Sequence, residues 1–184
     1  LDSLVDLQPE VWECRDRDVA PELVDELEEA VLSQLVEALP DSARELLSGA
    51  SVFRRSFEQV ALKDMIADQR TMMLAMRDLS EAFLLEHHTK WFQVHELARE
   101  IMRNRLREKP DEFRRAHAIA AEYYVRHFRA RQLVHIERRG VDFVEARYHL
   151  VQAGRESDLQ EIVEPFRRIL SEQIQGATPV PRDA

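Results

Sequence analysis

His95 is the side chain of this sequence whose type and position best suit chemistry. It follows residues that favour a strand and precedes a helical pattern, in the order Trp91-Phe92-Gln93-Val94-His95-Glu96-Leu97. The first backbone N–H groups of a helix lack partners, and the helix dipole makes that end positive. An imidazole there can donate a hydrogen bond to a phosphate oxygen. The alternative is that His95 only caps the helix or packs within the domain.

The other reactive residues complete no catalytic or metal site in the sequence. His87 and His88 are adjacent, so a strand would direct them to opposite faces, and no Cys or acidic residue has ligand spacing nearby. Cys14 has no paired base, and no Gly-x-x-x-x-Gly-Lys-Ser/Thr loop is present. The remaining histidines are spread through helical patterns (His117, His127, His135 and His149). We therefore expect no catalytic residue, no metal and no ATP hydrolysis by this chain.

A predicted β-hairpin positions His95. Phe83, Leu85, Trp91 and Phe92 supply the bulky residues of two short strands, and residues 87–90 supply a polar turn. A two-stranded ribbon is marginal by itself, and helical patterns stand on both sides of it. Helices followed by one β-hairpin and a further helix predict a winged helix.

Three helices are predicted before the hairpin helix. The first lies between Pro21 and Pro40, with apolar residues every four positions (Leu23, Leu27, Val31, Leu35 and Leu39). The second is capped by Asp41 or Ser42. The third is a short helix from Phe57 to Ile66, capped by Ser56.

A methionine-rich helix leads into the hairpin. Its residues recur at helical spacing (Met72, Met73, Met76, Leu79 and Phe83). Such a stripe can be an adaptable binding surface, but the helical spacing favours a place in the core.

The region after the hairpin is predicted to be helical. One helix continues to about Glu108, and Pro110 begins the next, whose apolar stripe includes Tyr123 and Phe128. The tail resembles a helical hairpin of the tetratricopeptide type, with Gly154 at the end of one helix and a kink at Pro165 in its partner. No period of about 34 residues repeats, and residues after Gln175 are typical of a linker.

Charge is distributed unevenly along the 184 residues, whose formal net charge is −9. Residues 1–50 carry 3 basic and 14 acidic side chains, whereas residues 51–150 carry 19 basic and 15 acidic ones. An acidic start disfavours binding to a nucleic-acid backbone, which needs positive surface. The basic surplus between Arg99 and Arg139 is either a solvated helix face or a binding surface.

Composition favours a soluble, mainly helical protein. Hydrophobic residues make up 45% and charged residues 33% of the chain, with only 4 Gly and 7 Pro. No apolar run is long enough to span a bilayer, and a single Cys suits a reducing interior, so we expect a cytoplasmic protein. The first residue is Leu, from which we expect a piece of a longer chain.

Residues 23–108 resemble the winged-helix region of the signal-transduction ATPases with numerous domains (STAND ATPases), which include apoptosis-scaffold, plant disease-resistance and bacterial regulator proteins. The resemblance lies in the segments LVEALPDSARELLSGASVFRRSFEQVAL and LSEAFLLEHHTKWFQVHELAREIM. The family has a Met-His-Asp motif at the end of the second wing strand, where this chain has Val94-His95-Glu96. The resemblance implies that His95 contacts the β-phosphate of ADP in a closed, inactive state. Val94 would pack as Met does, and Glu96 is one methylene longer than Asp.

The expected organisation has four parts. Residues 1–22 are a linker or the remnant of a preceding helical domain, 23–108 the winged helix, 109–174 the tetratricopeptide-like helices, and 175–184 a flexible tail. The expected function is a non-catalytic regulatory fragment that senses ADP or ATP bound elsewhere in the parent chain. It would contact an upstream nucleotide-binding domain of that chain and protein partners through its helical tail. The alternatives are an interaction scaffold without a nucleotide link and a winged-helix DNA-binding regulator; the second is disfavoured because residues 68–83 are not basic.

Overall fold

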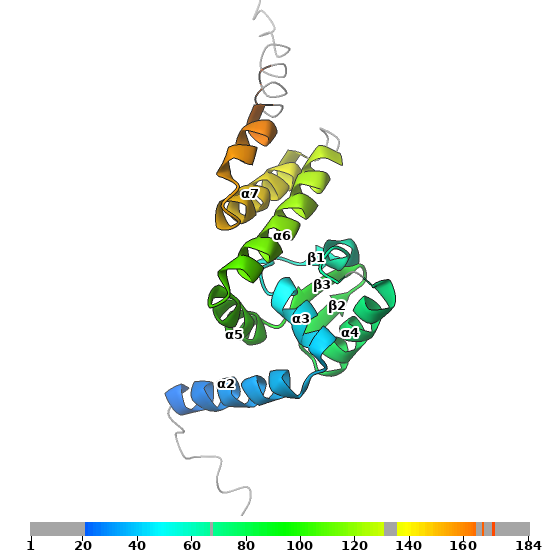
Figure 1. Cartoon of the computed structure of the whole chain (residues 1–184), viewed down its shortest axis with the longest axis vertical. Helices are drawn as coiled ribbons and strands as arrows, with labels where there is room; N and C mark the ends of the chain where they lie inside the picture. The colour runs from blue at the N-terminus through cyan, green and yellow to red at the C-terminus, as the bar shows by residue number, and fades with distance from the viewer. Residues whose placement is uncertain (1–20, 67, 131–135, 165–166, 168–170, 172–184) are drawn as a thin grey trace, which may run out of the picture.

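The computed structural model describes residues 21–66, 68–130, 136–164, 167 and 171, with only the backbone described at 21–25 and 136. Figure 1 shows three regions: the helix α2 (Pro21–Ala38) at one end, a compact unit of helices and strands in the middle, and a long helical pair at the other end. The described part of the chain is mainly helical and has one small antiparallel sheet. No described helix has the length and apolar character that crossing a membrane requires.

The middle unit alternates helices and strands. Its elements in chain order are α3 (Asp41–Ala50), β1 (Phe57–Glu58), the 3-10 helix η2 (Gln59–Leu62), α4 (Gln69–Glu81), β2 (Leu85–His88), β3 (Trp91–Val94) and α5 (Glu96–Arg107). The sheet order is β1-β3-β2, with both pairs antiparallel. The predicted hairpin and the helix that begins after His95 are confirmed.

The predicted helix from Phe57 to Ile66 is wrong. Phe57 instead lies in β1, opposite Phe92 of β3, and is followed by η2 and turns. The Phe57 side chain is fully buried, with its ring centroid 4.5 Å from that of Phe53. A helical propensity of a few residues is weaker than such burial. The expected cap, Ser56, donates from its hydroxyl to Gln93 Oε1 (3.2 Å).

The first two helices also differ in detail from their predictions. α2 lies between the two prolines as predicted, but only its second half is packed: Leu27 is 64% exposed and Val31 56% exposed. α3 begins after Pro40, which has no side-chain hydrogen bond to the helix, so the predicted caps Asp41 and Ser42 are wrong.

The predicted apolar stripe placed Phe83 in the core, and this prediction is wrong. Phe83 follows α4 in a left-handed backbone conformation with φ 58°, and it is 81% exposed. Its N–H donates to the Ser80 carbonyl (3.1 Å), and the Leu84 N–H donates to the Leu79 carbonyl (2.9 Å). This pair of bonds is a Schellman motif, whose left-handed position normally holds glycine. Met72, Met76 and Leu79 of the predicted stripe are buried, as predicted, whereas Met73 is 48% exposed, so its place in the core is wrong.

The predicted turn at residues 87–90 is shorter than expected. His87 and His88 belong to β2, where they face Phe92 and Trp91 across the hairpin, so the turn is made by Thr89 and Lys90. His87 stacks on the Phe92 ring (centroids 4.6 Å apart), and His88 lies near Glu86.

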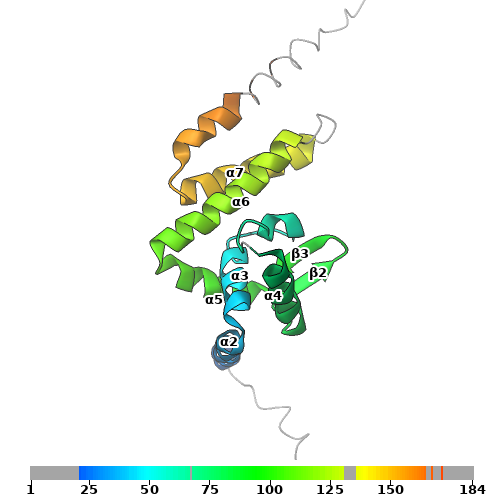
Figure 2. The same ribbon diagram turned by 45° about the vertical axis from the view of Figure 1, so that its right-hand side comes forward.

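Two long helices follow the middle unit. α6 (Pro110–Ala130) and α7 (Ile136–Gln152) lie side by side in opposite directions, as both ribbon views show (Figures 1 and 2). Gly154 follows α7 with φ 71°, as its predicted capping role requires. The 3-10 helix η4 (Glu156–Asp158) comes next in the chain. The predicted kink at Pro165 and all predictions for residues 1–20 and 172–184 lie outside the described residues.

One continuous core joins the middle unit to the helical pair. The main cluster of buried side chains extends from Val36 of α2 to Ala146 of α7. Tyr123 and Tyr124 of α6 belong to it, as their predicted packing role requires, and both ring centroids lie within 6 Å of Phe53. A smaller cluster of Ala121, Phe128, Leu150 and Ile162 continues the core between α6, α7 and the tail.

Candidate functional site

The predicted sensor motif lies where β3 passes into α5. Val94 is buried in the core opposite Leu85, whereas His95 and Glu96 are exposed. The backbone of His95 is fully engaged: its N–H donates to the Leu84 carbonyl (3.0 Å), and its carbonyl accepts from the Arg99 N–H (2.8 Å). The strand and the helix therefore fix the position of the imidazole from both sides.

In the described part of the chain, the imidazole of His95 provides neither a helix cap nor core packing. It makes no capping hydrogen bond to α5, although His95 is the residue at the cap position. It is exposed, so it does not pack in the core. Among the described residues, His95 therefore occupies the cap position of α5 with an exposed imidazole that makes no capping hydrogen bond.

Arg99 is the cation nearest in sequence to His95 on the same helix. Its guanidinium lies 3.4 Å from the Glu96 carboxylate and donates to the Arg54 carbonyl (3.4 Å). These contacts hold Arg99 over the first turn of α5, where free N–H groups also favour an anion. The negative charge of Glu96 disfavours an anion at this end of α5. The ion pair between Glu96 and Arg99 weakens that repulsion. His95 and Arg99 are four residues apart, a spacing that places them on one face of the helix. An exposed imidazole and a guanidinium on one face can bind a phosphate or a carboxylate.

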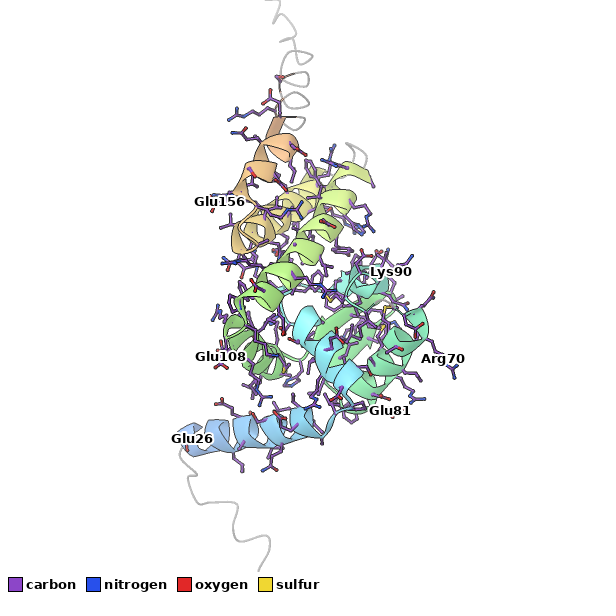
Figure 3. All side chains as sticks on the ribbon, viewed as in Figure 1. Glu26, Arg70, Glu81, Lys90, Glu108 and Glu156 are labelled. Carbon is purple, nitrogen blue, oxygen red and sulfur yellow. The ribbon has the colours of Figure 1, made fainter. Side chains whose placement is uncertain are left out.

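A groove of about 620 Å³ separates α4 from the hairpin. Its lining includes Met73, which is 48% exposed, together with Val60 and Phe92. The two cations of the groove are engaged: Arg77 lies 3.1 Å from Asp78, and Lys90 at the hairpin tip (labelled in Figure 3) lies 3.3 Å from Glu58. The groove therefore suits an apolar protein contact better than a polyanion.

A larger cleft of about 780 Å³ lies between α3, α5 and α6, with α2 at one side. Its floor is apolar and includes Met65 and Met102, and its rim alternates acids and bases. Gly49 lines it, and a Cβ at that position would approach the Met65 sulfur to 2.7 Å. The rim cations Arg105 and Arg44 both pair with Glu37 of α2. Because of these ion pairs, the cleft is a contact region between α2, α3 and α5 of this chain.

A buried polar cluster joins α6 and α7, and the sequence did not reveal it. His117 and His149 are fully buried, and their Nδ1 atoms lie 2.8 Å apart. Burial lowers the pKa of His117 to about 4, helped by the charges of Arg103, Arg107 and Arg54. Burial, followed by the charges of His117 and Arg54, lowers the pKa of His149 to about 2. Both imidazoles are therefore neutral near pH 7, and one donates to the other.

A buried carboxylate completes this joint. Glu145 of α7 is 3% exposed and accepts hydrogen bonds from Arg54 (3.1 Å to each oxygen) and Arg55 (3.2 Å). The Arg54 guanidinium also lies over the Tyr148 ring, 3.8 Å from its centroid. Glu145 and His149 are four residues apart on α7, a spacing that places them on one face. That spacing was the available signal, but their partners come from other helices and could not be read from it.

The described residues contain no group of three or more His, Cys, Asp or Glu that could hold a metal ion. The buried pair of His117 and His149 has no third ligand of these types within that part of the chain. Its chemistry is that of a packed, neutral hydrogen bond between two helices.

No protein-family model, curated protein or solved structure matches this chain.

Proposed function

We propose that residues 23–108 form a winged helix that regulates a nucleotide-binding domain, as in STAND ATPases. The order of α3, β1, η2, α4, β2, β3 and α5 supports this, because it matches the helices and wing of that fold. In the sheet order β1-β3-β2, strand β3 of the hairpin is central and strand β2 is at the edge. α6 and α7 then form an antiparallel helical hairpin of the tetratricopeptide-like type that links the module to partners.

The exposed, unengaged imidazole of His95 carries the proposal. His95 is fixed through its backbone at a strand–helix junction, and its side chain has no structural task among the described residues. In the proposed function it donates to the β-phosphate of ADP held by another domain, with Arg99 adding positive charge. This contact exists only in the closed arrangement, so bound ADP would shift the population toward it. The module itself is non-catalytic.

Reading of DNA by α4 is the less favoured function. A winged-helix reader places this helix in the major groove and needs positive surface. α4 carries two arginines and two acids, and Arg77 lies close to both Asp78 (3.1 Å) and Glu81 (3.6 Å). Met73 and Leu74 are the large apolar residues on its exposed side. This surface has no excess of cations with which to neutralise phosphates.

The test uses the natural gene product that contains this sequence, purified without added nucleotide. The protein is denatured, and released ADP and ATP are quantified by ion-pair chromatography for the wild type and for His95→Ala. Retained ADP in the wild type and its loss from the variant would support the proposal. His88→Ala is the matched control, because His88 is also exposed but contacts Glu86 on the hairpin. The absence of nucleotide from the wild type would refute the proposal.

An interaction scaffold is the second candidate, and the outer face of α7 favours it. Val141, Val144 and Val151 are all partly exposed along this helix. Such a row can contact a partner without any nucleotide. This candidate predicts that His95→Ala leaves every activity of the parent protein unchanged, whereas Val144→Glu weakens partner binding.

A further inference from the structure

The first half of α2 is a bare helix. Every side chain from residue 26 to residue 31 is exposed, over one and a half turns, and these residues include Leu27 and Val31. The second half of α2 is different, because Val36 and Leu39 are buried in the main core. Figure 1 shows the first half running past the end of α5, and Figure 3 shows Glu26 on this projecting end. The helix therefore extends beyond the surface that packs its second half.

A bare helix with an apolar stripe is an incomplete packing unit. Isolated helices of this length are marginal in water, and most helix stability in proteins comes from packing of the apolar face. Leu27 and Val31 are four residues apart and lie on one face. They are spaced as the anchors of a helix that docks against another apolar surface.

The charge of α2 defines the chemistry of the occupant. The helix contains six acidic residues and no Lys or Arg (Glu22, Asp25, Glu26, Glu28, Glu29 and Glu37). Glu37 pairs with Arg44 and Arg105 in the body of the protein. The carboxylates of Glu26 and Glu28 are exposed about 100° to either side of Leu27, whereas the exposed Glu29 lies on the opposite face. A surface that covers Leu27 and Val31 must lie beside the Glu26 and Glu28 carboxylates, so basic residues at its edges are favoured.

Charge also disfavours two segments of this sequence as occupants, namely α2 of a second copy and residues 1–20. A second copy that paired α2 with α2 would oppose two helices that each carry six acids and no base. Residues 1–20 carry six acidic and two basic side chains, a net charge of −4. Neither segment offers the positive edge that the carboxylates favour.

We propose that the first half of α2 is a docking helix for a protein partner that presents an apolar helix or groove bordered by Lys and Arg. Leu27 and Val31 insert into the apolar part, and the carboxylates of Glu26 and Glu28 pair with the basic border. The interface needs no nucleotide and lies on a different element from His95. It is therefore independent of the regulatory function proposed above.

The experiment measures binding of a designed basic helix to the full 184-residue chain. The probe is a labelled 21-residue peptide of three heptads, with Leu at the two core positions and Lys at the flanking positions, followed by fluorescence anisotropy in 50 mM salt. The wild type is expected to bind it, and Leu27→Ala with Val31→Ala is expected to weaken binding at least about tenfold, because two anchors are lost. Alanine favours the helix, so the variant retains α2.

Two controls separate the apolar contact from charge alone. Leu74→Ala removes an apolar side chain that is 42% exposed on α4, and it is expected to leave binding unchanged. A peptide with Glu in place of Lys is expected to bind at least about tenfold more weakly, since its charges repel those of α2. Absence of binding by the wild type, or equal binding by the double variant, would overturn the proposal.

Two further outcomes would name a different occupant and overturn the proposal as well. If a second copy covers α2, sedimentation velocity at about 5 to about 200 µM would reveal a dimer. The double variant would lose this dimer. A chain that begins at Pro21 would bind the peptide about tenfold more tightly if residues 1–20 cover this face. The proposal requires a monomer and equal affinity with and without residues 1–20.

Discussion

The histidines occupy two opposite environments in this molecule. At the joint between α6 and α7, His117 and His149 are fully buried, hydrogen-bonded to each other and surrounded by aromatic rings. At the junction of β3 and α5, His95 is exposed, and its side chain makes no capping hydrogen bond. The same residue type is a structural element in one region and an available ligand in the other.

The difference lies in which part of each residue the fold uses. The joint uses the side chains, because two helices meet there and the two buried Nδ1 atoms pair with each other. The Nε2 atoms of both rings are buried without a hydrogen-bond partner among the described residues. The junction uses only the backbone of His95, which is bonded to Leu84 and Arg99. A functional role of His95 is therefore compatible with a stable fold. His117 and His149 are instead enclosed between α6 and α7, where no ligand reaches their side chains. We expect substitutions at the joint to change stability and substitutions at the junction to leave it nearly unchanged.

The largest expected effect is the acid sensitivity of the joint. The unfolded chain protonates its histidines near pH 6.5, but the folded chain does so only near pH 4 at His117 and near pH 2 at His149. The free energy of unfolding therefore has its full value above about pH 6.5, and it decreases as the pH drops toward the folded-state pKa values. Each histidine contributes up to about 1.4 kcal/mol per pH unit.

Urea unfolding at pH 6.5 and pH 4.5 measures this loss, with His117→Leu and His149→Leu combined as the comparison. Replacing both partners by apolar groups leaves no unpaired imidazole, so the double variant should still fold. Its stability should fall less steeply with acid than that of the wild type. Equal slopes would show that the two imidazoles are accessible to protons in the folded state.

Arg54→Ala should be the next largest effect. It removes two of the three hydrogen bonds to the buried Glu145 carboxylate and leaves Arg55 as its cation. A buried carboxylate that loses its main partner destabilises a protein by about 3 kcal/mol, measured by urea unfolding at pH 7. Arg114→Ala is the matched control, because its pair with Asp111 is exposed and such pairs contribute roughly 0–1 kcal/mol.

Phe83→Gly should raise stability slightly, because Phe83 lies in the left-handed conformation that glycine adopts without strain. Its ring is 81% exposed and contributes little packing, so we expect a gain of about 1 kcal/mol. Thermal unfolding measures it. Phe83→Ala is the control, since alanine removes the ring but keeps the Cβ that causes the strain. A loss of stability in the glycine variant would show that the ring packs against the protein.

His95→Ala should have the smallest effect on stability, within about 0.5 kcal/mol, because the side chain makes no capping bond and is not buried. Thermal unfolding of the isolated chain measures it beside the wild type. A loss much above 1 kcal/mol would place His95 with the structural histidines of the joint and remove the contrast between the two regions.

Local patterns were sufficient to predict most elements of the fold. The hairpin, the helix after His95, the helix between Pro21 and Pro40, and the helix that begins at Pro110 were all readable from spacing, prolines and strand-forming residues. The patterns failed where tertiary contacts outweigh them. Phe57 lies in a third strand because burial beside Phe53 and pairing with Phe92 outweigh a short helical preference.

The candidate site was partly predictable. The position of His95 followed from local sequence, but its freedom from structural contacts required the structure. The pairing of His117 with His149, 32 residues apart, depends on how α6 and α7 pack, and no local spacing encodes it. Apolar spacing likewise could not distinguish the buried half of α2 from its bare half.

The sequence by itself indicated most of the helices and the hairpin, because these depend on propensity, prolines and apolar period over a few residues. Several of their exact boundaries, such as those of β1 and of the hairpin turn, came only from the structure. Only the tertiary structure decided which faces are covered and which polar groups meet. Coverage depends on neighbours that are distant in the chain: α5 and the core cover Val36 but do not reach Leu27, and Arg54 meets Glu145 across 91 residues. These long-range contacts make His149 structural and leave His95 available.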